Sequence, residues 1–125
     1  MIHLDTHVVV WLYAGQVERF PARCLRMLES QRPLISPMVR LELAFLQEIG
    51  RITVEPAVLL DTLRQHVDLG VAESAFPRVA ARATELPLTR DPFDRLIAAH
   101  ALCDDVPLLT RDRRLLEHCP VATWD

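Results

Sequence analysis

Several carboxylates in the sequence lie where they could act together on one substrate. Asp5 follows the short apolar segment 2–4, and Asp112 follows the apolar segment 107–110. Asp94 opens a long helical segment, and Glu42 lies inside another. Carboxylates that face one another repel unless a divalent cation lies between them, and oxygen-rich sites suit Mg²⁺ or Mn²⁺. Such an ion can activate a water and offset charge on a phosphodiester.

The same acids also have a structural interpretation. Asp5, Asp91 and Asp112 stand where they would cap helix N-termini, which aspartate does well. Asp94 lies three positions after Asp91, where an acid suits the helix dipole. Glu42 is harder to explain in this way, because its helical neighbours are apolar. An ionised carboxylate on an apolar face is costly unless it is paired or bound to a cation.

The segment "HLDTH", residues 3–7, alternates like a metal site on a strand. Alternate residues of a strand share one face, which would bring His3, Asp5 and His7 together. The predicted strand stops at Asp5, however, and a helix begins there. We therefore expect one ligand, Asp5, with His3 packed beneath the site and His7 in the first helical turn near it.

Short apolar strands alternate with helices along the chain, and these elements must position the acids. Pro37 and Pro92 stand at expected helix starts, where proline is favoured. This order predicts a parallel sheet covered on both faces, which binds ligands at the carboxyl ends of its strands. The expected strands are 2–4, 33–36, 67–71, 107–110 and 121–124, and the expected helices are 7–15, 18–31, 37–50, 55–66, 73–86, 91–105 and 112–119.

Composition excludes several classes of protein. The 125 residues suffice for a single domain, 1–125, and the net charge of −3 argues against a generally basic nucleic-acid coat. All 14 basic residues are arginine, so chemistry that needs a lysine amine is excluded. The three cysteines are far apart and indicate reduced thiols of a cytoplasmic protein. No apolar run is long enough to cross a membrane.

Four segments together resemble the PIN-domain family, in particular the VapC-type ribonuclease toxins of bacterial type II toxin–antitoxin systems. These are "LDTHVVVWLYAG", "SPMVRLELAFL", "RDPFDRLIAAHA" and "PLLTRDRRL". The resemblance spans essentially the whole chain. It implies a three-layer α/β/α sandwich with a central, mainly parallel sheet of 4–5 short strands, and an Mg²⁺-dependent ribonuclease, with Mn²⁺ as a possible substitute.

The family's four acidic positions match Asp5, Glu42, Asp94 and Asp112, which the resemblance makes both the catalytic residues and the metal ligands. One departure from the family pattern is His100, where relatives commonly carry glutamine. Residues expected to support the acids are Thr6, Thr110 and Asp91, and residues expected to hold the RNA backbone are Arg90, Arg95 and Arg111.

By resemblance, the reaction is endonucleolytic hydrolysis of RNA that leaves a 5′-phosphate and a 3′-hydroxyl. The resemblance also implies a VapB-type antitoxin that inserts an arginine or a similar group among the acids. Homodimers are common in the family, and the apolar stretches 8–13 and 38–49 could supply the surface.

Two other functions stay open from the sequence. A phosphatase on a similar α/β fold would use Asp5 as its nucleophile, but the second aspartate expected two residues later is His7. A non-catalytic binding module is the other alternative. A receiver-like domain needs a lysine, which the chain lacks, and an inactive relative should have lost an acid, whereas all four are present.

Overall fold

The computed structural model describes residues 1–125 and contains one sheet of five short parallel strands. The strand order is β3-β2-β1-β4-β5, and every pairing is parallel. In the central strand, His3 pairs with Leu34 on one side and Leu108 on the other. The strands are β1 (Ile2–Leu4), β2 (Pro33–Ile35), β3 (Gly70–Val71), β4 (Leu108–Leu109) and β5 (Ala122–Thr123).

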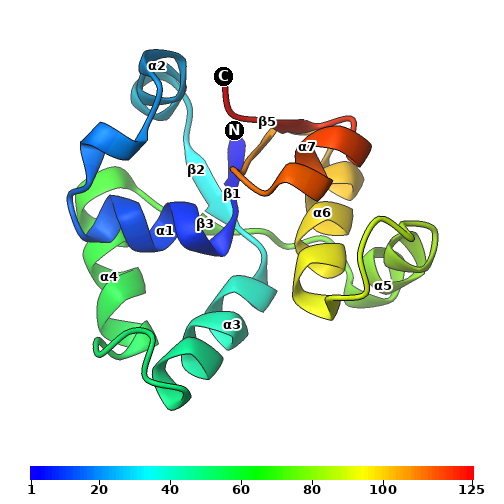
Figure 1. Ribbon diagram of the computed structural model, residues 1–125, viewed down its shortest axis with the longest axis horizontal. Helices are drawn as coiled ribbons and strands as arrows, with labels where there is room; N and C mark the ends of the chain where they lie inside the picture. Colours follow the sequence, from blue (N-terminus) through cyan, green and yellow to red (C-terminus); the bar gives the residue numbers. More distant parts are fainter.

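Helices flank the sheet and confirm the predicted α/β/α architecture. Figure 1 shows α1 and α4 on one side of the central strands and α5 and α6 on the other. The helices are α1 (Thr6–Tyr13), α2 (Ala22–Ser30), α3 (Pro37–Glu48), α4 (Pro56–Val67), α5 (Phe76–Thr84), α6 (Pro92–Asp104) and α7 (Arg113–His118), with a 3₁₀ turn, η1, at Val17–Arg19. No helix is long and apolar enough to span a membrane.

The predicted helix 18–31 is divided in the structure. Proline restricts the residue before it to extended backbone, and Phe20, before Pro21, has φ −98° and ψ 127°. The chain therefore forms η1 first and starts α2 only at Ala22. The remaining elements match the prediction in type and order, with ends that differ by a few residues.

The sheet core is apolar on both faces and holds the strand ends rigidly. All three residues of β1 are fully buried, and Leu108 and Leu109 of β4 are buried beside them. From β1 the chain passes to β2 on one side of the sheet, and it later returns to β4 on the other side. The carboxyl ends of β1 and β4 therefore form the switch point at which open parallel sheets bind ligands.

Candidate active site

Asp5 lies at this switch point, and its carboxylate is fixed by hydrogen bonds. Its backbone N–H donates to the Leu109 carbonyl at 3.0 Å, which continues the pairing of β1 with β4. Its Oδ1 accepts from the Thr6 N–H at 2.8 Å, and its Oδ2 accepts from the Thr110 hydroxyl at 2.7 Å. The residue is only 2% exposed. Asp5 is thus both the N-cap of α1 and a carboxylate with one fixed orientation.

Thr110 links Asp5 to a second acid. Its Oγ1 also accepts from the Asp112 N–H at 3.0 Å, so one hydroxyl joins the two acidic residues. The Asp112 carboxylate caps α7 by accepting from the Leu115 N–H at 3.0 Å. That contact uses Oδ1, and Asp112 still lines the same cleft as Asp5.

Glu42 and Asp94 reach the cleft from two helices. Glu42 projects from α3, and its carboxylate accepts a hydrogen bond from the Thr6 hydroxyl. Asp94 is the third residue of α6, whose N-cap is Asp91. Carboxylate oxygens of Glu42, Asp91 and Asp94 lie within 4.8 Å of one another. The helix cap at Asp91 is confirmed, with Oδ1 accepting from the Phe93 N–H at 2.9 Å.

The four matched acids share one cleft of about 330 Å³. Threonine, histidine and arginine side chains join them, and apolar side chains form part of the wall. Figure 1 shows α3 and the start of α6 below the end of β1. The residues that line the cleft are Asp5, Thr6, His7, Val10, Glu42, Leu46, Arg51, Ile52, Asp94 and Asp112.

Burial and mutual repulsion make two of these acids hard to ionise. Burial raises the pKa of Asp94 to about 8, and the negative charges of Asp5, Asp91, Asp112 and Glu42 add to the effect. Burial also raises the pKa of Glu42; the Thr6 hydrogen bond opposes this rise, and the charges of Asp5 and Asp91 add to it. A bound cation would reverse the cost of ionising these groups, because it attracts the charges that otherwise repel one another.

The donor set fits a hard divalent cation. Every close ligand atom available is a carboxylate or hydroxyl oxygen, with no cysteine among the lining residues. Mg²⁺ and Mn²⁺ prefer such oxygen ligands, whereas zinc sites are usually built from cysteine and histidine. His7 is the one residue in the cleft whose nitrogen could bind a metal, and its Nε2 already accepts a hydrogen bond from a backbone N–H.

His7 lies in the first turn of α1 beside Asp5, as the sequence predicted. Its Nε2 accepts from the Arg111 N–H at 2.9 Å, so in the neutral ring the proton is on Nδ1. That Nδ1 is 3.7 Å from Oδ2 of Asp5. Burial lowers the pKa of His7 despite the neighbouring carboxylates. The ring therefore joins the loop before α7 to the edge of the acidic cleft.

The arginines expected to hold RNA are not equivalent in the structure. The Arg95 guanidinium donates twice to the Ala83 carbonyl, at 3.1 and 2.8 Å, and so fastens the end of α5. Arg90 and Arg111 are exposed and lie outside the cleft wall. The cation that does line the cleft is Arg51, just after α3, which the sequence analysis missed. No motif marks Arg51, because only the fold brings it to the acids.

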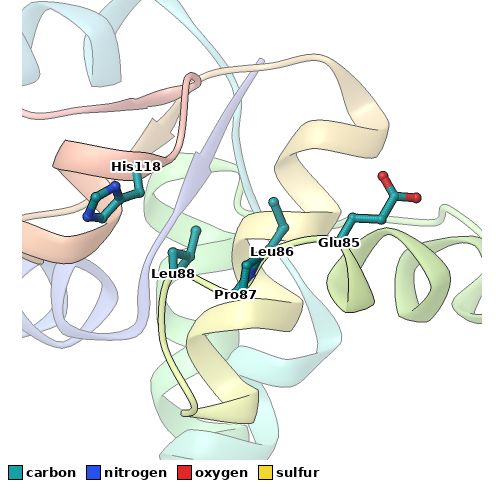
Figure 2. A pocket seen from close by; sticks show the side chains of 5 residues that line it. All are labelled: Glu85, Leu86, Pro87, Leu88 and His118. Atoms are coloured by element: carbon teal, nitrogen blue, oxygen red, sulfur yellow. The ribbon is translucent and has the colours of Figure 1, made fainter.

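Another hollow is lined by residues 85–88 and His118. Figure 2 shows Glu85 and His118 at its two ends, with Leu86, Pro87 and Leu88 between them. Its two ionisable groups do not converge, and none of the four matched acids lines it. We therefore place the chemistry in the acidic cleft.

Comparisons with known proteins agree with this geometry. The model of the PIN domain family matches residues 2–119. The chain is 36% identical to ribonuclease VapC22 of Mycobacterium tuberculosis, over 97% of this chain and 96% of that protein. Its fold resembles the VapBC2 complex from Rickettsia felis bound to promoter DNA (TM-score 0.71, 18% identity, all of both chains). It also resembles DNA-bound VapBC from Salmonella typhimurium (TM-score 0.64, 16% identity, 99% and 96% of the two chains).

Proposed function

Because the chain belongs to the PIN domain family, we propose that it is the endoribonuclease toxin of a toxin–antitoxin pair and that a divalent cation in the acidic cleft is essential. The observation that carries the proposal is the convergence of Asp5, Glu42, Asp94 and Asp112 on one cleft at the switch point of the sheet. The 36% identical relative is a ribonuclease, and the similar structures are VapBC complexes.

The four acids have distinct roles in this proposal. Asp5, Asp94 and Asp112 hold the cation directly or through water. Glu42 completes the site or orients the attacking water. When bound, Mg²⁺ or Mn²⁺ lowers the pKa of a water and offsets the charge that develops on the phosphodiester.

Neighbouring side chains keep these acids in position. The Thr110 hydroxyl holds Oδ2 of Asp5, and the Thr6 hydroxyl holds Glu42, so each carboxylate keeps one orientation. Asp91 caps α6 and keeps the Asp94 end of that helix in place. Because Asp5 and Glu42 are held before any cation binds, little ordering entropy is lost at these two residues when it does.

Basic residues around the cleft hold the RNA backbone. Arg51 lines the cleft itself, and in this proposal its guanidinium pairs with a phosphate next to the scissile bond. Arg90 and Arg111 are exposed, and we propose that they contact the RNA backbone further from the acids. Arg95 contributes by fixing α5 to α6 rather than by contacting RNA, because its guanidinium is engaged with Ala83.

The partner we propose is a VapB-type antitoxin, since the similar structures are VapBC complexes. The metal-free cleft favours a cation, because none of its carboxylates forms a salt bridge with an arginine, and burial lowers the pKa of His7, the histidine beside Asp5. An arginine of the antitoxin would match this charge and exclude the metal. Inhibition and metal binding then compete for the same carboxylates in the cytoplasm.

A homodimer is the oligomer we propose, with α3 as its surface. Leu41, Phe45 and Ile49 follow one another along this helix and are 56%, 48% and 52% exposed. Exposed apolar stripes of this kind typically mark protein contacts. The stretch 8–13, which the sequence also suggested, is a poorer surface because Val8 and Val9 are fully buried in the core.

The test is cleavage of a labelled RNA by the purified chain with Mg²⁺, with the product ends identified. We expect 5′-phosphate and 3′-hydroxyl ends, and loss of cleavage in the Asp5→Asn and Asp94→Asn variants. Asp61→Asn is a matched control, because Asp61 is an exposed aspartate on α4 that pairs with Arg64. Wild-type cleavage by a folded Asp5→Asn or Asp94→Asn variant would refute the site assignment.

A further inference from the structure

A network of polar side chains, centred on the buried rings of His3 and His100, joins β1, α3 and α6. The Ser74 hydroxyl donates to one oxygen of Asp104, and the other oxygen is 2.6 Å from Nε2 of His3. His3 packs against His100 with ring centroids 5.7 Å apart. Nδ1 of His100 is 3.0 Å from the Ser36 hydroxyl. His3 is fully buried, and His100 is 4% exposed.

The positions of the hydrogens in this network follow from its contacts. Ser36 Oγ accepts from the Met38 N–H, so its own hydrogen is free to donate to His100 Nδ1. His3 Nε2 donates to Asp104, because a carboxylate oxygen accepts, and a neutral His3 ring then has no hydrogen on Nδ1. His100 Nε2 then carries a hydrogen while His3 Nδ1 carries a lone pair. Neither of these two buried atoms has a hydrogen-bond partner, and the two rings meet only by packing.

The network joins three elements, each of which carries or leads into an acid of the cleft. His3 is the middle residue of β1, which leads directly into Asp5. Ser36 is the N-cap of α3, the helix of Glu42. His100 and Asp104 both belong to α6, the helix of Asp94. The bond between Ser36 and His100 therefore fixes α6 to α3, and the bond between Asp104 and His3 fixes α6 to β1.

Packing alone does not require histidine at either place. The neighbours of His100 along α6, Ala99 and Ala101, are buried apolar residues, and Ile2 and Leu4 flank His3 in β1. An apolar side chain would fill the same space without leaving polar atoms to satisfy. Buried polar networks instead specify one arrangement of the elements that they join.

We propose that His3 and His100 are positioning residues for the acidic cleft: they hold α6 at a fixed place relative to β1 and α3, and so set the separation of Asp94 from Asp5 and Glu42. This proposal rests on the proposed function, since it concerns the metal site of that cleft. Replacing a residue that orients metal ligands without binding the metal typically lowers metal affinity by about 10- to 100-fold.

The test is Mn²⁺ binding by the full chain, measured by calorimetry and without RNA. His100→Leu removes the bond to Ser36, whereas His100→Asn places an amide where Nδ1 was. We expect Mn²⁺ affinity to fall about 10- to 100-fold in His100→Leu and to stay near wild type in His100→Asn. His3→Leu and His3→Gln form the same kind of pair, because the glutamine amide reaches the place of Nε2 opposite Asp104.

The proposal is overturned if folded His100→Leu binds Mn²⁺ as tightly as wild type, or if His100→Asn loses as much affinity as His100→Leu. Should His100→Leu fail to fold, Ser36→Ala breaks the same bond from the other side. Unchanged Mn²⁺ affinity in Ser36→Ala would then refute the proposal. With both variants folded, the double variant should lose no more affinity than Ser36→Ala alone, because Ser36→Ala already removes the bond to His100 together with the cap bond from the Met38 N–H.

The same titration distinguishes this proposal from the proposed function. If wild type binds Mn²⁺, Asp94→Asn does not, and His100→Leu binds normally, the metal site stands and only the positioning role is wrong. If wild type binds no Mn²⁺ at all, the metal dependence of the proposed function is refuted and the positioning role with it.

Discussion

Replacing Asp94 with asparagine should change how the stability of the metal-free protein depends on pH. The pKa of Asp94 is about 8 in the folded chain, against an ordinary value of 3.8. The folded state therefore holds a proton that the unfolded state releases. The stability present below the ordinary pKa is lost as the pH rises towards about 8, with a slope of up to about 1.4 kcal/mol per pH unit.

The size of the loss follows from the same pKa. Without solvent screening, the difference between the two pKa values of Asp94 corresponds to a loss of about 6 kcal/mol in the free energy of unfolding. Asp94 is only partly buried, so screening by solvent reduces the expected loss to about 2–3 kcal/mol between pH 5 and pH 8. Asparagine has no proton to release, so its variant should lack this component. It should also be more stable than wild type at pH 8 when metal is absent.

The assay is urea unfolding in EDTA at several pH values, for wild type and Asp94→Asn. The difference between the two proteins is the informative quantity, because other groups titrate as well. Burial lowers the pKa of His3, His7 and His100, which makes stability rise with pH and opposes the Asp94 contribution. Equal pH dependence in the two proteins, or a lower stability of Asp94→Asn at pH 8, would refute this reasoning.

Four further predictions concern the cleft and its surroundings. Asp5→Asn should lower Mg²⁺-dependent RNA cleavage by at least about 100-fold in a kinetic assay, because it removes a fixed ligand charge; cleavage within tenfold of wild type (about 1.4 kcal/mol) would contradict this. Thr110→Val should cost about 1–3 kcal/mol in urea unfolding and weaken Mn²⁺ binding, because the buried Asp5 oxygen loses its donor; an unchanged stability would show that the bond is unimportant. Arg51→Ala should raise KM for RNA more than it lowers kcat and reduce the log–log salt slope of RNA binding by about 0.7, as one lost phosphate contact would; an unaltered slope would remove Arg51 from the RNA site. Phe45→Glu should convert a dimer to a monomer in light scattering, since it places a charge in the apolar stripe of α3; a dimer that persists would place the contact elsewhere.

The fold was predictable because each strand is a short apolar run bounded by clear helix signals. Asp91 before Pro92 and Pro37 mark two helix starts in the sequence; Asp91 caps α6 as predicted, whereas Ser36, expected at the end of a strand, caps α3. The position of Asp5 in the cleft was predictable for a related reason, since it follows the carboxyl end of a parallel strand, where ligands bind. The one divided helix, at Pro21, shows that a local break outweighs apolar periodicity.

The rest of the site depends on contacts between distant parts of the chain. Nothing local shows that the Thr6 hydroxyl reaches Glu42, or that Arg51 enters the cleft while Arg95 turns to Ala83. The bond between Ser36 and His100 likewise joins residues that are far apart in sequence. Such contacts follow from helix packing, which a single sequence does not reveal.

We propose that the acidic cleft cuts RNA by means of a divalent cation held by its carboxylates. The most direct measurement is the rate of RNA cleavage by the purified chain in EDTA and after Mg²⁺ is restored, in parallel with folded Asp5→Asn. We predict no cleavage in EDTA, full recovery with Mg²⁺ in wild type, and none in the variant. Cleavage that persists in EDTA, or that Mg²⁺ restores equally in Asp5→Asn, would contradict the claim.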